Sequence, residues 1–142
     1  MKTKILLPLI LLFFFAGCSK DEGNTAASQQ YSITLSGSSF AGKNSKWQIS
    51  SLMINAVSQT LTTAQKTFQK QYTSDGKFSD SDGLMGTWSI PVTDSLIENY
   101  SNLSSGVNVR QGYKIANLSN VQMSLTYTVN GSNVTTVYTS VP

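Results

Sequence analysis

A strict alternation of apolar and polar residues between positions 121 and 129 constrains the fold of this chain more than any other feature. Apolar residues occupy one phase and polar residues the other: Val121, Met123, Leu125, Tyr127 and Val129 against Gln122, Ser124, Thr126 and Thr128. Because successive side chains of a β-strand point to opposite faces, this period of two predicts a strand with one buried and one solvated face.

Asn130-Gly131 follows this strand, and the pair favours the two-residue type I′ turn of a β-hairpin. A turn at these residues sets Val129 opposite Ser132. The same register pairs the buried positions of the first strand with the returning strand: Tyr127 with Val134, Leu125 with Thr136, and Met123 with Tyr138. Apolar residues of both strands then share one face, which predicts a hairpin over residues 121–138.

Shorter patterns of the same kind run upstream. Trp47 and Ile49 alternate, and Leu52 and Ile54 continue on the opposite phase, which predicts a β-bulge near Ser50-Ser51. Further strands are predicted at 68–72, near 78, at 84–90 and at 113–115, with turns at 74–76 and 80–83. Pro91 is expected to end the strand before it.

The segment from Asp94 to Leu103 fits two interpretations. Ser95 and Glu98 match a helix capping box, and Leu96, Tyr100 and Leu103 lie at helical spacing. The flanking chain is strand-like, so a short helix and a strand are equally expected here.

Seven or eight short strands with turns every eight to twelve residues predict a β-sandwich or a barrel. An ordered series of segments then resembles the small lipocalin-like domains of bacterial lipoproteins: Lys46–Ser50, Asp75–Phe78, Gly86–Ile90, Gly112–Ser119 and the closing strand pair Val121–Tyr138. This resemblance covers about residues 40–140 and implies an all-β, antiparallel, eight-stranded barrel, assigned here to residues 31–142. The stretch from Pro91 to Gln111 departs from it, because such domains have a compact strand there.

The N-terminus has the pattern of a secretory signal peptide. Met1–Lys4 is basic, and Ile5–Ala16 is an apolar run interrupted by Pro8. Twelve residues are too few to span a bilayer, which needs about 20. Residues 1–17 are therefore predicted to be removed, and the polar, small residues 18–30 to form a flexible tether.

The end of this segment, Phe15-Ala16-Gly17-Cys18, resembles a lipobox. The resemblance implies cleavage before Cys18 and attachment of acyl chains such as palmitate to its thiol, which anchors the protein to a membrane. Ser19 stands where an aspartate would imply retention in the inner membrane, so the outer membrane is expected. The segment Ser19–Glu22 is similar to the tag of Bacteroidota-type surface lipoproteins and implies display on the cell surface; a solvated, charged tether is the alternative.

Charge and composition exclude several functions. The chain has ten Lys and Arg against seven Asp and Glu, and losing Lys2 and Lys4 leaves a net charge of +1. The remaining basic residues are scattered, so the basic stripe of a nucleic-acid-binding protein is missing. The absence of histidine and the single cysteine exclude histidine-based catalysis, thiol pairs and Cys/His zinc sites. We therefore expect neither an enzyme nor a cofactor.

Two acidic groups are candidates for chemistry, and a simpler interpretation is favoured for each. Asp75, Asp80 and Asp82 offer oxygen ligands for calcium, but their spacing is not that of a calcium loop, and tight turns favour the same residues. Asp94 and Glu98 could act as a carboxylate pair, but a solvated helix or strand face is expected there.

Seven aromatic side chains are candidates to line the barrel interior and bind a ligand: Trp47, Phe68, Phe78, Trp88, Tyr113, Tyr127 and Tyr138. An eight-stranded barrel either packs its interior solid or holds one small ligand. Our first hypothesis is a lipid-anchored barrel that binds a small apolar or amphipathic molecule, and a cavity of roughly 300 Å³ or more would favour it. The alternative is a non-catalytic surface module that contacts glycan or protein through aromatic side chains on its outer face.

Overall fold

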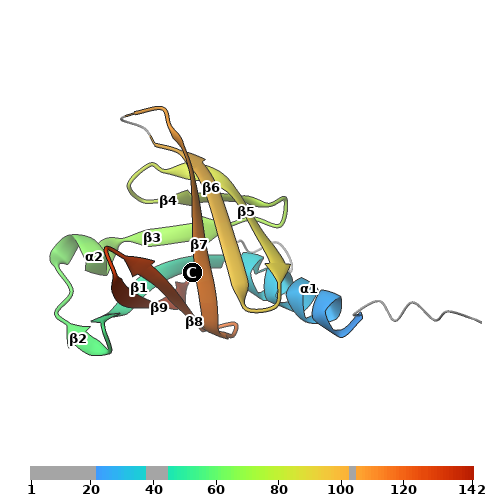
Figure 1. Cartoon of the computed structure of the whole chain (residues 1–142), viewed down its shortest axis with the longest axis horizontal. Coiled ribbons are helices and arrows are strands. Elements are labelled where there is room, and N and C mark those ends of the chain that lie inside the picture. The colour runs from blue at the N-terminus through green and yellow to red at the C-terminus, as the bar shows by residue number, and fades with distance from the viewer. Residues whose placement is uncertain (1–21, 38–44, 103–104) are drawn as a thin grey trace, which may run out of the picture.

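The computed structural model describes residues 22–37, 45–102 and 105–142, so Cys18 and the predicted signal peptide lie outside the described residues. Two helices and nine strands follow one another along the chain (Figure 1): α1 (Glu22–Ser36), β1 (Ser45–Ile54), β2 (Val57–Gln59), α2 (Thr63–Thr67), β3 (Gln69–Tyr72), β4 (Lys77–Asp80), β5 (Met85–Val92), β6 (Ser95–Ser101), β7 (Asn108–Leu118), β8 (Gln122–Val129) and β9 (Ser132–Val141).

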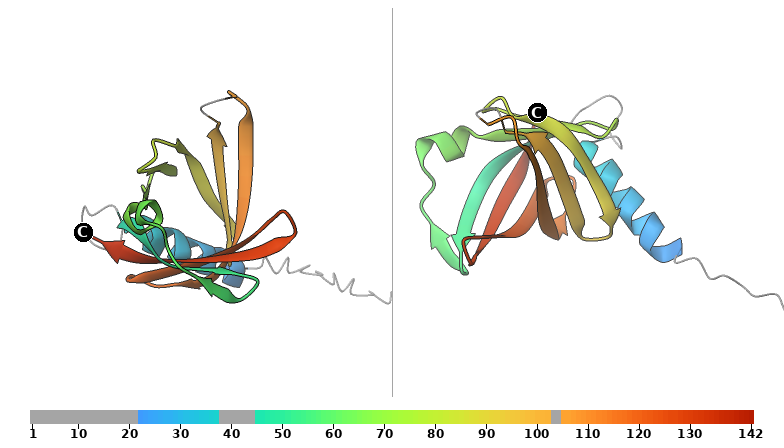
Figure 2. Two further views of the ribbon diagram at one scale, coloured as in Figure 1. Left: turned by 90° about the vertical axis from the view of Figure 1, so that its left-hand side faces the viewer. Right: turned by 45° about the horizontal axis from the view of Figure 1, so that its top comes forward.

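Eight of these strands close into an antiparallel barrel (Figure 2). The strand order is β1-β3-β4-β5-β6-β7-β8-β9, and β9 returns to pair with β1 from Lys46↔Val141 to Ile54↔Val134. The short β2 lies beside the second half of β1, whereas β3 pairs with its first half. The predicted eight-stranded barrel is thus confirmed, and closure by β1 and β9 decides against a sandwich. The architecture is consistent with a lipocalin-like fold.

The predicted C-terminal hairpin is confirmed in its register. Val129 pairs with Ser132, and the pairing continues through Tyr127↔Val134 to Met123↔Tyr138. Asn130 and Gly131 have φ values of 49° and 78°, as both turn residues of a type I′ turn require. Glycine suits this position because it adopts a positive φ without steric cost.

The predicted bulge in the first strand is also confirmed. The register of β1 against β9 shifts between Ile49 and Ser51. This extra residue reverses the alternation, so Trp47 and Ile49 face the interior before it, and Leu52 and Ile54 lie on the pocket wall after it.

The structure differs from the sequence-based predictions in two segments, and in a third it decides between two interpretations. Residues 95–101 form strand β6, where helix and strand were equally expected. Pro91 was expected to end a strand, and this is wrong: β5 continues to Val92, and the pairing of β5 with β6 is irregular between Ser89 and Val92, where a missing N–H is tolerated. Helix α1 includes residues 22–30, which the sequence predicted to lack regular structure.

The two helices lie at opposite ends of the barrel (Figures 1 and 2). Helix α1 packs on β5 and also contacts β3 and β7, so it crosses one opening. Its Leu35 is fully buried in the core, and its backbone oxygen accepts a 3.0 Å hydrogen bond from Nε1 of Trp47. Helix α2 packs on β1 and is held at its start by a capping box of Thr62 and Gln65.

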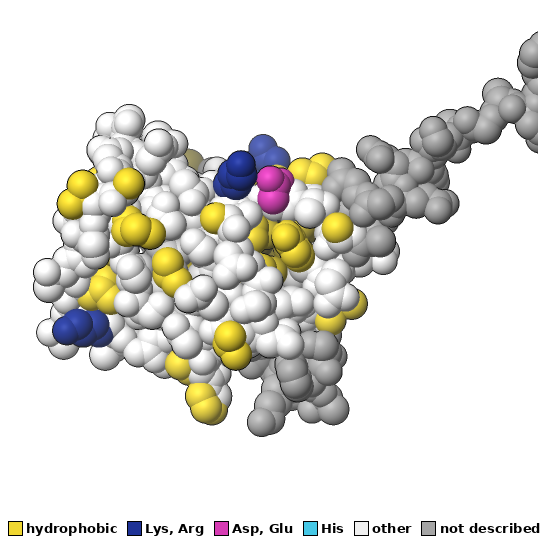
Figure 3. All heavy atoms as spheres, turned by 90° about the horizontal axis from the view of Figure 1, so that it is seen from below, with side chains coloured by type: hydrophobic (Ala, Val, Ile, Leu, Met, Phe, Trp, Pro, Cys, Tyr) yellow, Lys and Arg dark blue, Asp and Glu magenta, His cyan; other side chains and the backbone are white. Residues whose placement is uncertain are grey.

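The outer surface has few charges and no large apolar patch on the face that Figure 3 shows, where hydrophobic side chains are scattered among polar groups and backbone. This agrees with a charged content of 12%, about half that of an average protein. Neither described helix is long and apolar enough to cross a membrane.

Candidate functional site

A pocket of about 530 Å³ opens at the α2 end of the barrel. Strands β1, β8 and β9 form most of its wall, and α2 with the preceding loop forms one side of its mouth. Its lining residues are Ile49, Leu52, Ile54, Leu61, Ala64, Gln65, Phe68, Lys70, Asp80, Asp82, Tyr113, Tyr127, Val129, Val134, Thr136 and Tyr138. The volume is in the range of sites that hold a small molecule.

The part of the pocket wall that β9 contributes changes from apolar to polar along the strand. Val134, Thr136 and Tyr138 follow one another at alternate positions of β9, and each is buried. Val134 pairs with Ile54 near the turn at Asn130-Gly131, whereas Tyr138 pairs with Ile49 further along the barrel. On β9, the apolar Val134 therefore lies nearer the Asn130-Gly131 turn, and the hydroxyl groups of Thr136 and Tyr138 lie further along the barrel.

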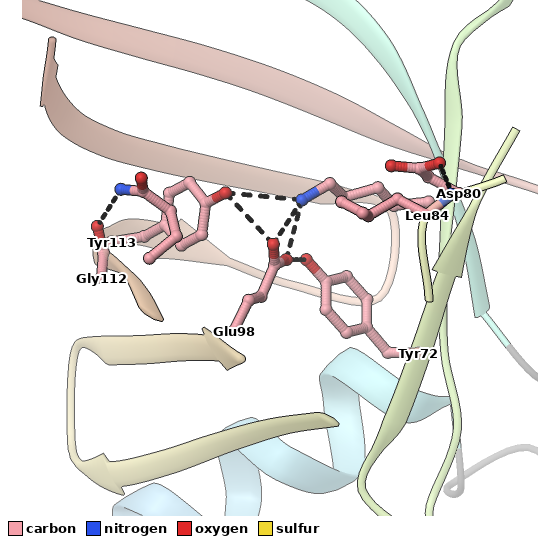
Figure 4. A network of polar contacts seen from close by, with 8 residues as sticks. Tyr72, Asp80, Leu84, Glu98, Gly112 and Tyr113 are labelled. Atoms are coloured by element: carbon pink, nitrogen blue, oxygen red, sulfur yellow. Dashed lines mark hydrogen bonds and ion pairs between the residues drawn. The ribbon is translucent and has the colours of Figure 1, made fainter. Parts of the chain in front are cut away.

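Lys70, which lines the pocket, belongs to an ion pair inside the barrel. Lys70 of β3 and Glu98 of β6 are 6% and 0% exposed, and Nζ of Lys70 lies 2.8 and 2.7 Å from the two carboxylate oxygens. The hydroxyl of Tyr72 donates to Oε1 at 2.5 Å, and that of Tyr113 donates to Oε2 at 3.1 Å (Figure 4). Both oxygens of Glu98 thus accept two hydrogen bonds each.

The ammonium group of Lys70 also faces two aromatic rings. Its Nζ lies 5.4 Å from the ring centroid of Phe78 and 5.3 Å from that of Tyr113, within the range of cation–π attraction. Ion pairing and ring contacts together compensate for the water that the ammonium group loses on burial.

The buried tyrosines are held in their neutral form. Burial, and then the nearby negative charge of Glu98, raise the pKa of the hydroxyls of Tyr72, Tyr113 and Tyr138 above the ordinary range. A protonated phenol donates a hydrogen bond, so Tyr72 and Tyr113 act as donors to Glu98 at physiological pH. These bonds occupy both oxygens of the Glu98 carboxylate.

The expectation that Glu98 lies on a solvated face is wrong, because its side chain is fully buried. The sequence does carry a signal for the burial of Glu98. Phe68, Lys70 and Tyr72 share one strand phase, as do Leu96, Glu98 and Tyr100. If residues 94–103 form a strand, Lys70 and Glu98 each lie among apolar residues on the buried face of a strand. Charged residues are buried almost only in pairs, so this pattern predicts that the two side chains pair.

The seven predicted aromatic residues separate into two groups. Four lie on the pocket wall, namely Phe68, Tyr113, Tyr127 and Tyr138. The other three, Trp47, Phe78 and Trp88, belong to the core cluster and do not line the pocket. The indole nitrogen of Trp88 donates to the backbone oxygen of Thr73 at 3.1 Å, and that of Trp47 is bonded to α1, so neither is free for a ligand.

The acidic turn residues serve the turns. Asp75 forms an exposed 2.7 Å ion pair with Lys77, and the hydrogen bonds from Lys77 and Thr73 lower the pKa of its carboxyl to about 2. Oδ1 of Asp80 accepts hydrogen bonds from the backbone nitrogens of Asp82 and Leu84. Among residues 22–37, 45–102 and 105–142, no three acidic, histidine or cysteine side chains lie close enough together to hold a metal ion.

Two other hollows, of about 580 and 470 Å³, lie at turns and strand ends. Both include Met85, which is 69% exposed, and neither is lined by a buried charged residue. The pocket above Lys70 and Glu98 is therefore the better candidate, because it alone of the three combines a barrel interior with buried polar groups.

Comparison with known proteins identifies no relative of this chain. The chain matches none of the known protein-family models, and neither a curated protein nor a solved structure matches it at a significant level.

Proposed function

We propose that this protein binds a small amphipathic molecule in the pocket at the α2 end of its barrel, without chemical turnover. The observation that carries the proposal is the pocket itself, with a volume of about 530 Å³ and a lining that combines apolar side chains with hydroxyl and other polar groups. A ligand with an apolar body and a polar end matches this combination.

The alternative, a surface module that contacts glycan or protein through outer aromatic side chains, has less support. In the described part of the chain, the large hydrophobic side chains that are exposed are aliphatic or methionine: Ile33, Ile54, Val57, Met85, Val92, Val107, Val121 and Val129. An aromatic platform for stacking a sugar is therefore not found there.

We also propose that the barrel is anchored to the outer membrane through a lipid on Cys18 and is displayed at the cell surface. This rests on the similarity of residues 15–18 to a lipobox and of residues 19–22 to a surface tag. A Cys18→Ala variant is expected to remain unprocessed, to incorporate no labelled fatty acid and to leave the membrane fraction. Normal maturation of this variant would refute the anchor and leave the binding proposal standing.

Native mass spectrometry of the mature protein, purified from its own cell envelope, tests ligand binding. We expect a reproducible extra mass that is released on unfolding. Ala64→Trp places an indole at the pocket mouth on exposed helix α2, and it should abolish the extra mass. Thr63→Trp adds the same side chain one residue earlier, outside the lining of the pocket, and should retain it. Absence of bound mass in the unaltered protein under gentle ionisation contradicts the proposal.

A further inference from the structure

The charged groups of Lys70 and Glu98 are already bonded within the barrel: Nζ of Lys70 contacts both oxygens of Glu98, and the hydroxyl of Tyr113 at 3.5 Å. Each oxygen of Glu98 already accepts one hydrogen bond from Lys70 and one from a tyrosine, Tyr72 or Tyr113. The formal charges of Lys70 and Glu98 cancel. A charged ligand group at this depth would be desolvated without an available counter-charge, which is costly.

An anionic group is further disfavoured by the acids around the pocket. Asp80 and Asp82 also lie in its lining, so the four charged residues that line it or bond to its lining are one lysine and three acids. A carboxylate or phosphate that approaches Lys70 would compete with Glu98 and be repelled by all three acids. A cationic group would in turn meet the ammonium group of Lys70.

Two neutral hydroxyl groups of the pocket lining remain available. Thr136 and Tyr138 are 2% and 6% exposed and both line the pocket. Among the residues that the structure describes, neither hydroxyl has a hydrogen-bond partner. Every fully enclosed side-chain nitrogen or oxygen there does have one, so these two hydroxyls face the open space of the pocket. A buried hydroxyl gains from a partner, which here a ligand can provide.

We propose that the ligand is an uncharged amphiphile, whose hydroxyl, ester or amide end bonds to Thr136 and Tyr138 while its hydrocarbon body contacts the apolar lining residues Leu52, Ile54 and Val134. This inference rests on the proposed function and specifies the chemistry of the ligand. The hydroxyls of Thr136 and Tyr138 each donate and accept, so they suit a ligand oxygen that does the same.

Three probes with the same hydrocarbon chain test the inference: a fatty alcohol, the matching fatty acid and the matching alkyl amine. Their affinities are measured by displacement of an environment-sensitive apolar dye at neutral pH and below the critical micelle concentrations. We expect the alcohol to bind at least about tenfold more tightly than the acid or the amine, since burying an unpaired charge costs more than that.

The outcomes separate this inference from the proposed function. Equal binding of all three probes, or tightest binding of the acid or the amine, overturns the uncharged-ligand inference while the pocket remains a binding site. If neither the dye nor any probe binds, both proposals fail together.

Two conservative variants locate the polar end. Thr136→Val and Tyr138→Phe remove one hydroxyl each and keep the side-chain shape, and each should weaken the alcohol by about threefold to tenfold, the value of one neutral hydrogen bond. Binding of the acid should not change. Thr135→Val is the matched control, because Thr135 precedes Thr136 on the opposite face of β9 and bonds to Thr126 at 3.2 Å. Unchanged alcohol binding in both hydroxyl variants would overturn the assignment.

Discussion

At the scale of single residues, Lys70 and Glu98 are the most consequential side chains of the interior. They lie on strands β3 and β6, 28 residues apart in sequence, and their charges meet across the barrel. A buried pair of this kind contributes little compared with an apolar pair of the same shape, but removing one partner leaves the other charge buried and uncompensated.

Glu98→Gln is therefore expected to lower the free energy of unfolding by about 3–5 kcal/mol, measured by urea denaturation. The double variant Lys70→Met/Glu98→Gln should recover much of that loss, because no charge then stays buried. Asp75→Asn, which removes the exposed pair with Lys77, is the control and should leave stability unchanged. A double variant as unstable as Glu98→Gln would contradict this explanation.

The buried tyrosines predict a loss of stability at alkaline pH. The folded protein holds the protons of Tyr72, Tyr113 and Tyr138 more tightly than the unfolded chain. The unfolded chain releases these protons from about pH 10. The stabilisation that the three tyrosines provide is therefore fully present below about pH 10. Above that pH the free energy of unfolding falls, by up to about 1.4 kcal/mol per pH unit for each group.

Urea denaturation at a series of alkaline pH values measures this slope. The variant Tyr113→Phe/Tyr138→Phe should show a shallower decline, since two of the three groups are gone. Identical slopes for the variant and the unaltered protein would show that the pKa values of these two hydroxyls are not raised in the folded state.

At the scale of elements, the sheet of β4, β5 and β6 depends on a close approach at Gly86. A Cβ at this position would lie 2.2 Å from the backbone oxygen of Asn99 and 2.8 Å from the ring of Phe78. Gly86→Ala is expected to destabilise the barrel by about 1–3 kcal/mol or more, because backbone must move. Gly112→Ala adds a Cβ that meets nothing within 4 Å, so chemical denaturation should separate the two variants clearly. Equal stability would contradict the close approach.

Elements were predictable where a local pattern repeats. The β8–β9 hairpin combines period-two alternation with a turn pair that requires positive φ, and both signals depend on neighbouring residues only. Residues 94–103 are ambiguous in the sequence, because Leu96, Tyr100 and Leu103 lie at helical spacing and Ser95 with Glu98 matches a capping box, while the flanking chain is strand-like. Pairing with β5 and β7 decides it.

At the scale of the whole molecule, α1 completes the core from outside the barrel. Leu35 is fully buried at the end opposite the pocket, whereas Ile33 on the same helix is 40% exposed. Leu35→Ala should cost about 2–5 kcal/mol in unfolding free energy, the usual range for a buried leucine, and Ile33→Ala should have a much smaller effect. Thermal or urea unfolding compares them, and a loss for Leu35→Ala as small as that for Ile33→Ala would contradict the packing of α1 into the core.

The sequence by itself determined the all-β class, the register of the C-terminal hairpin and the bulge in β1. These follow from backbone geometry within one strand or one turn, which nearby residues specify. Only the tertiary structure decided that β9 closes on β1, that Lys70 meets Glu98, and that the pocket includes Tyr138 and excludes Trp88. Those facts depend on strand stagger and closure around the barrel, which bring together side chains far apart in the chain.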